Sequence, residues 1–277
     1  MTLIAQLSDT HIREPGRVAY GRVNTADYLA RAVRSLIALP QQPDAVVITG
    51  DLVDFGRRAE YEHLAALLAP IRQPIYLMPG NHDDPAMMRA CFADDPWLAA
   101  PMPGGFLQYS VRIGAIRLLT LDTTVPGQSH GELCDVRLDW LERELAACAG
   151  EPVIVAMHHP PFTTLIGHMD AIGLRSGHER LRRLVAAHDN IERIICGHLH
   201  RAIDVRFAGT IASTSPAPAH QVCLDLAPDA ASAFAMEPPG FRLHAYTPAT
   251  GVVTHLAAIG EFDGPHPFHE PGGALID

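Results

Sequence analysis

The stretch "VVITGDLVDFG", Val46 to Gly56, decides the fold class of this chain. A run of β-branched residues that ends in glycine is typical of a buried strand whose carboxyl end opens into a loop. That loop presents two carboxylates, Asp51 and Asp54, on either side of a Leu-Val pair. In open α/β sheets, ligands bind outside the carboxyl ends of the strands. The stretch therefore predicts an α/β fold with its chemistry at this end.

The same pattern recurs along the chain. Short apolar runs rich in Ile and Val end in polar residues or glycine, and they read "TLIAQL", "DAVVIT", "PIYLMP", "PVIVAM" and "RIICG". Helical patterns lie between them; in "TADYLARAVRSLIAL", Leu29, Val33 and Leu36 recur at helical spacing. Strands separated by helices predict parallel pairing in a layered α/β domain, with the strand ends along one rim.

Two regions depart from this alternation. The segments "FLQYSVRIG" and "AIRLLTLD" adjoin without a helix, which predicts an antiparallel hairpin. After Gly197 the pattern becomes β, in the runs "AIDVRFAGTIAST", "HQVCLDL", "FRLHAYT" and "GVVTHLA". The Pro-rich and Ala-rich residues 228–240 predict a loop or crossover. We expect residues 1–200 to form the core, and residues 201–277 to complete its strands and add a β-rich extension within one compact unit.

Composition excludes several classes of protein. With 277 residues, 48% of them hydrophobic, the chain can bury one large core. A net charge of −10 argues against nucleic acid or an anionic membrane as partner and favours a small substrate. The five cysteines are scattered and form no C-x-x-C pair, which predicts a reducing cytoplasm. No apolar run approaches the ~20 residues that span a bilayer, and the start of the chain has no signal-peptide pattern.

Every predicted strand end carries Asp, Asn or His. Parallel strands bring such ends together although they are far apart in sequence. Imidazole and carboxylate without thiolate suit divalent first-row metals such as Mn, Fe, Co or Zn. The candidate side chains at these ends are Asp9, His11, Asp51, Asn81, His82, His158, His198 and His200.

The order of these motifs resembles that of the calcineurin-like metallophosphoesterase superfamily. Its pattern is D-x-H, G-D, G-N-H-[DE], H and G-H-x-H, and the five motifs of this chain span residues 9–200. Each motif is common alone, whereas the ordered set is specific. The stretches "GNHDD", "MHHPP" and "HQV" are most similar to bacterial glycerophosphodiesterases and class III cyclic-nucleotide phosphodiesterases, and this similarity runs to about Leu226. The resemblance implies a layered sandwich of β-sheets flanked by helices.

The resemblance also implies two metal ions per chain, divalent or mixed-valence, whose identity stays open among Mn, Fe, Co and Zn. Asp51 would bridge them, because a carboxylate where a rigid strand stops can hold two cations about 3.5–4 Å apart. The first ion would be held by Asp9, His11 and His200, and the second by Asn81, His158 and His198.

The implied activity is hydrolysis of small phosphodiesters by attack of a metal-bound hydroxide. Two divalent ions balanced by Asp9, Asp51 and a bridging hydroxide leave one positive charge, which suits the single negative charge of a diester. Cyclic nucleotides and glycerophosphodiesters both remain open as substrates. If one of the two ions were ferric iron, two positive charges would be left.

Five side chains receive further roles, and the same resemblance implies those of the first three, His82, Asn81 and His220. His82 would act as a general acid or would donate to a phosphate oxygen; the alternative is a structural turn residue. Asn81 and His220 would also contact substrate, and for His220 a purely local role is the alternative. We expect Asp54 to order the loop or a ligand through a hydrogen bond. His159, which is followed by two prolines, is expected to support a ligand or a turn.

Other functions fit the sequence less well. Protein serine/threonine phosphatases read G-D-x-V-D-R-G and R-G-N-H-E, whereas Phe55 and Pro79 replace the two arginines here and Asp83 replaces the glutamate. A nuclease is an alternative, but the acidic chain has no recognisable basic stripe. A non-catalytic scaffold is disfavoured because all seven ligand positions are present.

Since "FRLHAYT" leaves an apolar face to cover and related enzymes use such extensions for dimer contacts, we expect a homodimer or larger homo-oligomer.

Overall fold

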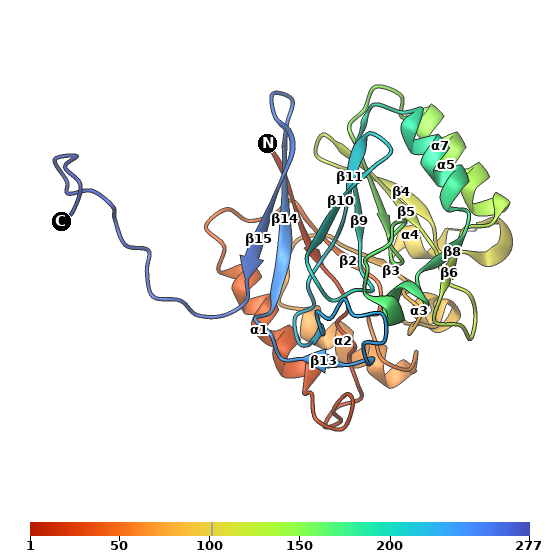
Figure 1. Cartoon of the computed structure of the whole chain (residues 1–277), viewed down its shortest axis with the longest axis horizontal. Helices are drawn as coiled ribbons and strands as arrows, with labels where there is room; N and C mark the ends of the chain where they lie inside the picture. Colours follow the sequence, from red (N-terminus) through yellow and green to blue (C-terminus); the bar gives the residue numbers. More distant parts are fainter. Residues whose placement is uncertain (101) are drawn as a thin grey trace.

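The computed structural model describes residues 1–100 and 102–277, and two large β-sheets packed against each other form its centre (Figure 1). The first sheet has the strand order β15-β14-β1-β2-β3, with β1, β2 and β3 parallel and β14 and β15 antiparallel. Its strands are β1 (Thr2–Leu7), β2 (Ala45–Thr49), β3 (Ile75–Met78), β14 (Gly240–Thr247) and β15 (Gly251–Ala258). In β1 and β2 every residue is buried, which explains their continuous apolar runs.

The second sheet has the strand order β10-β11-β9-β7-β5-β4. Its inner strands β11, β9, β7 and β5 are parallel, and β4 and β10 pair antiparallel at the two edges. The hairpin predicted from adjoining strand patterns is confirmed as β4 and β5, in register from Tyr109 opposite Thr120. The strands are β4 (Tyr109–Ile113), β5 (Ile116–Leu121), β7 (Val153–Met157), β9 (Ile191–Cys196), β10 (Ile203–Phe207) and β11 (Thr210–Thr214).

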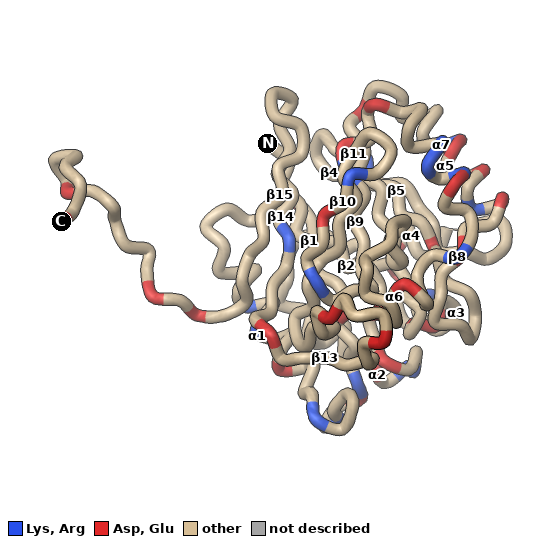
Figure 2. Tube along the Cα trace, viewed as in Figure 1, with Lys and Arg blue, Asp and Glu red and all other residues tan. Residues whose placement is uncertain are grey.

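Helices cover the outer faces of this sandwich. On the second sheet, α5 and α7 lie side by side, and Arg180 of α7 forms ion pairs with three carboxylates of α5 (Figures 1 and 2). The helices are α1 (Thr25–Ile37), α2 (Arg58–Leu68), α3 (Pro85–Cys91), α4 (Pro96–Ala99), α5 (Asp135–Ala147), α6 (Gly167–Asp170) and α7 (His178–Ala186), with a 3-10 turn, η1 (Pro103–Gly105). Among the described residues, no helix combines the length and apolar character needed to cross a bilayer.

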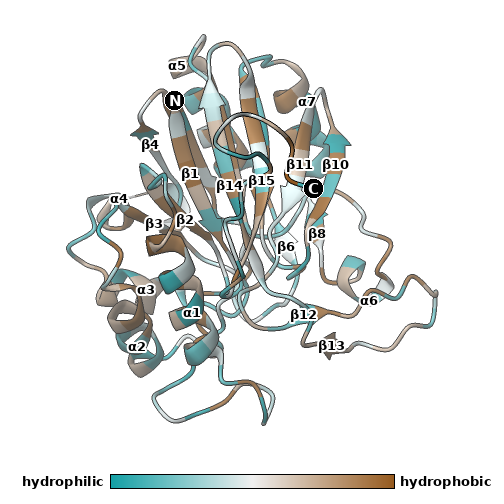
Figure 3. Cartoon of the chain, turned by 90° about the vertical axis from the view of Figure 1, so that its left-hand side faces the viewer, coloured by the Kyte–Doolittle hydropathy of each residue, from teal (hydrophilic) through white to brown (hydrophobic). Residues whose placement is uncertain are grey.

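A large hydrophobic core fills the space between the sheets, and β1 and β2, which contribute to it, carry brown segments in Figure 3. Polar side chains also join the sheets. Gln6 Nε2 donates to the carbonyl of Cys196 (2.9 Å), and Tyr109 Oη donates to the carbonyl of Leu77 (2.7 Å). Because buried donors need partners, these bonds fix how the two sheets align. The side chain of Cys196 is itself buried between the sheets.

The expectation of a single rim of strand ends is wrong, because the strands divide between two sheets. The carboxyl ends of β1, β2 and β3 come from the first sheet, and those of β7 and β9 come from the second. They meet nevertheless: Asp9, after β1, accepts a hydrogen bond from the backbone N–H of His198, after β9 (2.9 Å). The sandwich thus brings all five motifs to one end of the molecule.

The strand prediction for "HQVCLDL" is also largely wrong. Only β12 (Gln221–Val222) forms there, and it pairs with β13 (Phe234–Ala235), inside the stretch predicted as a loop. Leu224 and Leu226 lack a partner strand and remain 63% and 55% exposed, so their apolar character does not make a strand. A second short ladder joins β6 (Gly131–Glu132) and β8 (Leu174–Ser176).

Candidate metal centre

The strand ends that carry the predicted ligands have an unusual backbone. Five of the seven have a left-handed conformation, which costs a non-glycine residue about 1–3 kcal/mol. The surrounding sheets hold these turns in place and so direct the side chains inward. The residues and their φ angles are Asp9 (55°), His11 (45°), Asp51 (49°), His198 (72°) and His200 (52°).

Three motif glycines leave room for the ring of His158. A Cβ atom on Gly50 would lie 2.5 Å from its Nδ1, one on Gly80 would lie 2.8 Å from its Cε1, and one on Gly197 would lie 3.0 Å from its Nδ1. Real Cβ atoms essentially never approach another heavy atom below 3.0 Å. Glycine in these motifs therefore lets three loops close around one imidazole.

The first group of donor atoms comprises Asp9, His11, Asp51 and His200, all buried and all within 4.8 Å of one another. His11 Nε2 lies 3.1 Å from His200 Nε2 and 3.6 Å from Asp51 Oδ2, and His200 Nε2 lies 3.7 Å from Asp9 Oδ1. Two ligands about 2.1 Å from one cation, at 90–110° to each other, are about 3.0–3.5 Å apart. The spacing is close to that of a coordination shell.

The second group lies on the other side of Asp51. His158 Nε2 is 3.1 Å from Asn81 Oδ1 and 3.4 Å from Asp51 Oδ2, and the ring of His198 is 5.2 Å from that of His158. Since Asp51 Oδ2 is also within 3.6 Å of His11 Nε2, this carboxylate is common to both groups. The predicted bridging role of Asp51 would need such a shared position.

Hydrogen bonds behind the imidazoles fix which nitrogen faces the centre. His158 Nδ1 donates to the carbonyl of Thr49 (2.8 Å), and His200 Nδ1 donates to the carbonyl of His220 (3.1 Å). His11 Nδ1 lies 3.3 Å from Asp54 Oδ1, the hydrogen bond expected for Asp54. Each contact leaves the Nε2 lone pair free toward the centre, as in metal sites whose histidines are oriented by an outer acceptor.

The neutral imidazoles of this site and its buried polar atoms without a partner both suit a bound cation. Burial lowers the pKa of His200 to about 3 and that of His198 well below its usual range, so both rings are neutral ligands. Burial, reinforced by the charge of Asp51, raises the pKa of Asp9 to about 6. Asp9 Oδ2 and His198 Nε2 are buried without a hydrogen-bond partner, which is unfavourable unless another group satisfies them. The donor set of oxygen and imidazole nitrogen suits a first-row divalent metal.

His82 stands at the edge of the centre. Its backbone N–H donates to Asp51 Oδ1 (2.9 Å), and its ring lies edge-on to that of His11 at 4.7 Å. Its Nδ1 donates to the carbonyl of Asp54 (2.9 Å), so Nε2 is the nitrogen left for a substrate. The side chain is 35% exposed, unlike the buried donors around it.

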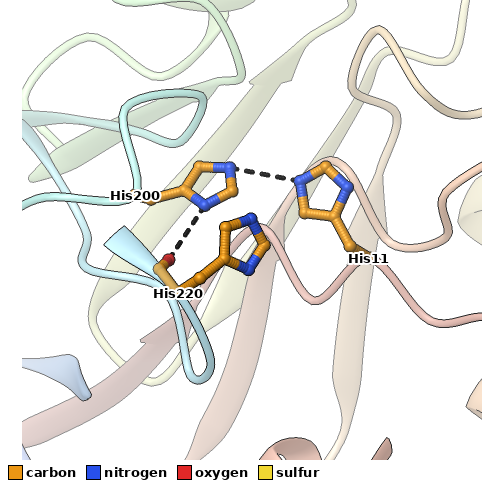
Figure 4. A group of neighbouring side chains, drawn as sticks. All are labelled: His11, His200 and His220. Carbon is orange, nitrogen blue, oxygen red and sulfur yellow. Dashed lines mark hydrogen bonds between the residues drawn. The ribbon is translucent and has the colours of Figure 1, made fainter. Parts of the chain in front are cut away.

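His220 comes closer to the first donor group than its sequence position suggested. Its ring lies 4.6 Å from that of His200 and 5.6 Å from that of His11 (Figure 4). Its Nδ1 is buried without a partner, and burial lowers the pKa of its imidazole to about 2. The structure thus brings a neutral imidazole from the loop between β11 and β12 to the rim of the centre.

Two residues support the centre from outside. Asp83 accepts hydrogen bonds from the backbone N–H groups of Gly80 and Leu52 and from the hydroxyl of Tyr61, so it ties the third motif loop to the second. Both ring nitrogens of His159 are occupied, by the hydroxyl of Thr123 (2.8 Å) and the carbonyl of Ser129 (3.1 Å). His159 therefore braces the loop rather than facing the centre.

A cavity of about 440 Å³ opens over the donor groups. Asp51, Asn81, His82 and other histidines supply its polar lining, and apolar side chains supply the rest. The sequence did not predict this apolar lining, because no motif marks it and segments far apart in the chain supply it. Its larger side chains are Tyr20, Met169, Ile172, Val222 and Phe234.

A sequence model described as Calcineurin-like phosphoesterase matches residues 2–202. The chain belongs to this family. Calcineurin-like phosphoesterases bind two metal ions, and this family member has buried side-chain clusters that could hold them.

Related proteins extend the similarity over almost the whole phosphoesterase chain. It is 36% identical over 275 residues to a probable glycerophosphodiester phosphodiesterase, GpdQ, of Arcobacter nitrofigilis, covering 99% of this chain and 100% of the relative. It is 31% identical over 260 residues to the 3',5'-cyclic adenosine monophosphate phosphodiesterase CpdA of Escherichia coli K12, covering 92% and 90%. Similarity therefore continues past Leu226, where the sequence alone had shown none.

Solved structures show the same fold at low identity. A dimetal phosphatase from Danio rerio superposes with a TM-score of 0.64 at 16% identity, covering 94% of this phosphoesterase and 99% of that chain. At that identity the likeness concerns the fold alone.

Proposed function

We propose that this protein is a metal-dependent phosphodiesterase that hydrolyses small phosphodiesters. The observation that carries the proposal is the pair of donor groups that share Asp51 and face a cavity walled by His82 and His220. Relatives named as glycerophosphodiester and cyclic-nucleotide phosphodiesterases support it.

Seven side chains would hold the metals. Asp51 would contact both ions, and when bound, such cations lower the pKa of water toward about 7 and draw charge from phosphate oxygens. The neutral ligand Asn81 keeps the net charge of the centre positive. The first ion would be held by Asp9, His11 and His200, and the second by Asn81, His158 and His198.

The protein's own groups would orient the diester and handle the proton. His82 Nε2, left free by the bond from Nδ1 to the carbonyl of Asp54, would donate to the leaving oxygen or to a phosphate oxygen. The imidazole of His220, which also lines the cavity, would contact the substrate. Phe55 and Pro79, in place of the arginines of protein phosphatases, leave the site without their grip on a dianion.

A substrate panel tests this function. We expect bis(p-nitrophenyl) phosphate, cyclic AMP or glycerophosphocholine to be hydrolysed with a higher kcat/KM than p-nitrophenyl phosphate, in the presence of added Mn²⁺. Metal analysis of gently purified protein should find Mn, Fe, Co or Zn, the ions that this donor set suits. Equal or better turnover of the monoester would refute the diesterase proposal, and an absence of tightly bound metal would favour a non-catalytic scaffold.

The remaining alternatives are less well supported. A nuclease needs a basic track for the phosphate backbone, whereas Arg positions in Figure 2 are interspersed with acidic ones and the net charge is −10.

All five cysteines are unpaired, which supports a reducing compartment, and we propose the cytoplasm.

A further inference from the structure

A second cavity adjoins the first at Asn81. It has a volume of about 400 Å³, and Asn81 is a wall of both cavities. Apart from Asn81 they share no lining residue: the first is bounded by His82 and the histidines, and the second by α3, η1 and the loop after β5. A phosphate held by the donor groups beside Asn81 would therefore face two separate spaces.

The charged side chains of the second cavity are largely occupied by the protein itself. The guanidinium of Arg89 donates to the carbonyls of Leu98, Gly105 and Phe106. The carboxylate of Asp122 accepts from the backbone N–H of Leu107 and from Thr124. The arginine is therefore not available to pair with a bound anion.

Much of the remaining lining is apolar, and Asp83 and Asp84 form an acidic edge. Phe106, Val125 and Pro126 supply apolar surface, and the exposed Asp84 supplies negative charge. Such a space favours an organic group that is uncharged or cationic, because an anionic group would meet a carboxylate and no free cation.

We propose that the second cavity binds the second organic substituent of a linear phosphodiester, and that this enzyme acts on linear diesters in preference to cyclic nucleotides. In a linear diester the two substituents leave phosphorus through different oxygens, so each cavity can take one. In a cyclic nucleotide both ester oxygens belong to one ribose, so the molecule can fill only one cavity.

This inference rests on the proposed diesterase function and deepens it. In the hydrolysis, the oxygen of water forms a bond to phosphorus, one ester P–O bond breaks, and the departing oxygen takes a proton to leave as an alcohol. The other substituent stays on the resulting monoester. Binding energy from the second cavity would act on linear diesters alone.

Two alanines of α3 provide a matched test. Ala86 and Ala90 are both exposed, but only Ala86 lines the cavity. With Mn²⁺ present, Ala86→Trp should lower kcat/KM for bis(p-nitrophenyl) phosphate at least tenfold, mainly through KM, and should leave cyclic AMP hydrolysis within twofold of wild type. Ala90→Trp should leave kcat/KM for both substrates within twofold of wild type. Ala86→Leu, a smaller intrusion, should give an intermediate loss and serves if the Trp variant does not fold.

A binding measurement separates the cavity from the chemistry. Diphenylphosphinate carries two aryl groups and no ester bond, so its affinity can be measured by titration calorimetry without turnover. We expect Ala86→Trp to weaken it at least tenfold and Ala90→Trp to leave it unchanged. If binding depends on Ala86 but the wild type hydrolyses no diester, the cavity assignment stands and the proposed function fails. The cavity assignment fails if diesters are hydrolysed but Ala86→Trp changes neither the binding of diphenylphosphinate nor KM. It also fails if Ala86→Trp lowers kcat/KM for cyclic AMP as much as for the linear diester.

Discussion

At the scale of single residues, the two donor groups differ in charge. Asn81 offers only a neutral amide oxygen, whereas the other group keeps Asp9 as well as a share of Asp51. Asn81→Ala should therefore empty mainly the site of His158 and His198, leaving about one metal per chain and little activity, and high Mn²⁺ should restore part of the activity by mass action. Metal stoichiometry and diesterase rate across a Mn²⁺ titration measure both effects.

Asp51→Ala is the comparison for that variant. Because Asp51 Oδ2 lies near both His11 and His158, its loss should weaken both sites, and added Mn²⁺ should rescue far less activity. An Asn81→Ala protein that kept two metals and near-normal activity would show that Asn81 is not a ligand.

His82 allows a prediction about the leaving group. If its free Nε2 donates a proton to the departing oxygen, His82→Ala should lower kcat about 100-fold or more for a diester with an alkyl leaving group. The loss in kcat should be much smaller for bis(p-nitrophenyl) phosphate, because its leaving group departs as p-nitrophenolate and needs no proton. The measurement is kcat for glycerophosphocholine and bis(p-nitrophenyl) phosphate, with metal content as control. Equal losses for both substrates would assign His82 to phosphate binding instead.

The sequence predicted the polar side of the site because its residues sit in local motifs at strand ends. Asp9, Asp51 and His158 could be found this way, since a strand followed by a polar turn is a local pattern. Tyr20 and Phe234 could not, because they approach His220 only through the folded chain, at ring distances of 5.0 and 5.2 Å. No spacing in the sequence records such a contact.

At the scale of elements, the motif glycines connect the strands to the centre. A side chain on Gly80 would collide with the backbone N and the Oδ1 of Asp51 and with the ring of His158, although its φ is not left-handed. Gly80→Ala should lower the free energy of unfolding by about 1–3 kcal/mol through overpacking and should also reduce bound metal. Urea unfolding and metal analysis measure the two effects.

Gly272→Ala is the matched control, because nothing lies within 4 Å of its added Cβ and its φ is also not left-handed. We expect a change within about 0.5 kcal/mol there, as for most surface substitutions. A Gly80→Ala protein as stable and as rich in metal as this control would contradict the close approach of the three loops.

Strands and helices were predictable one by one, but their assignment to sheets was not. Local periodicity identifies β1 and β7 equally well and does not say that they belong to different sheets. That division depends on long-range contacts such as Gln6 with the carbonyl of Cys196, which are 190 positions apart. The short pairing of β12 with β13 likewise depends on which segments the folded body brings together.

At the scale of the whole molecule, the apolar surface left uncovered is not where the sequence placed it. The strand in "FRLHAYT" is β14, an inner strand paired with β1 and β15, and its Phe241 is buried. Several exposed apolar side chains belong instead to the edge strand β15 and to the arm of residues 259–277 that extends from it (Figure 1). Leu256 is 60% exposed, and Phe262 and Phe268 are 69% and 81% exposed.

An edge strand with apolar side chains and unpaired backbone groups is a ready surface for a second copy of the chain. We therefore still expect a homodimer or larger homo-oligomer, now through β15 and the arm. Light scattering at micromolar concentration should give at least twice the chain mass of 30.0 kDa. Leu256→Lys should shift the mass toward the monomer, since it places a charge in the proposed contact. Leu224→Lys, at a leucine 63% exposed elsewhere, should not. A wild-type mass of 30.0 kDa under these conditions would mean that β15 and its arm face solvent in the working enzyme.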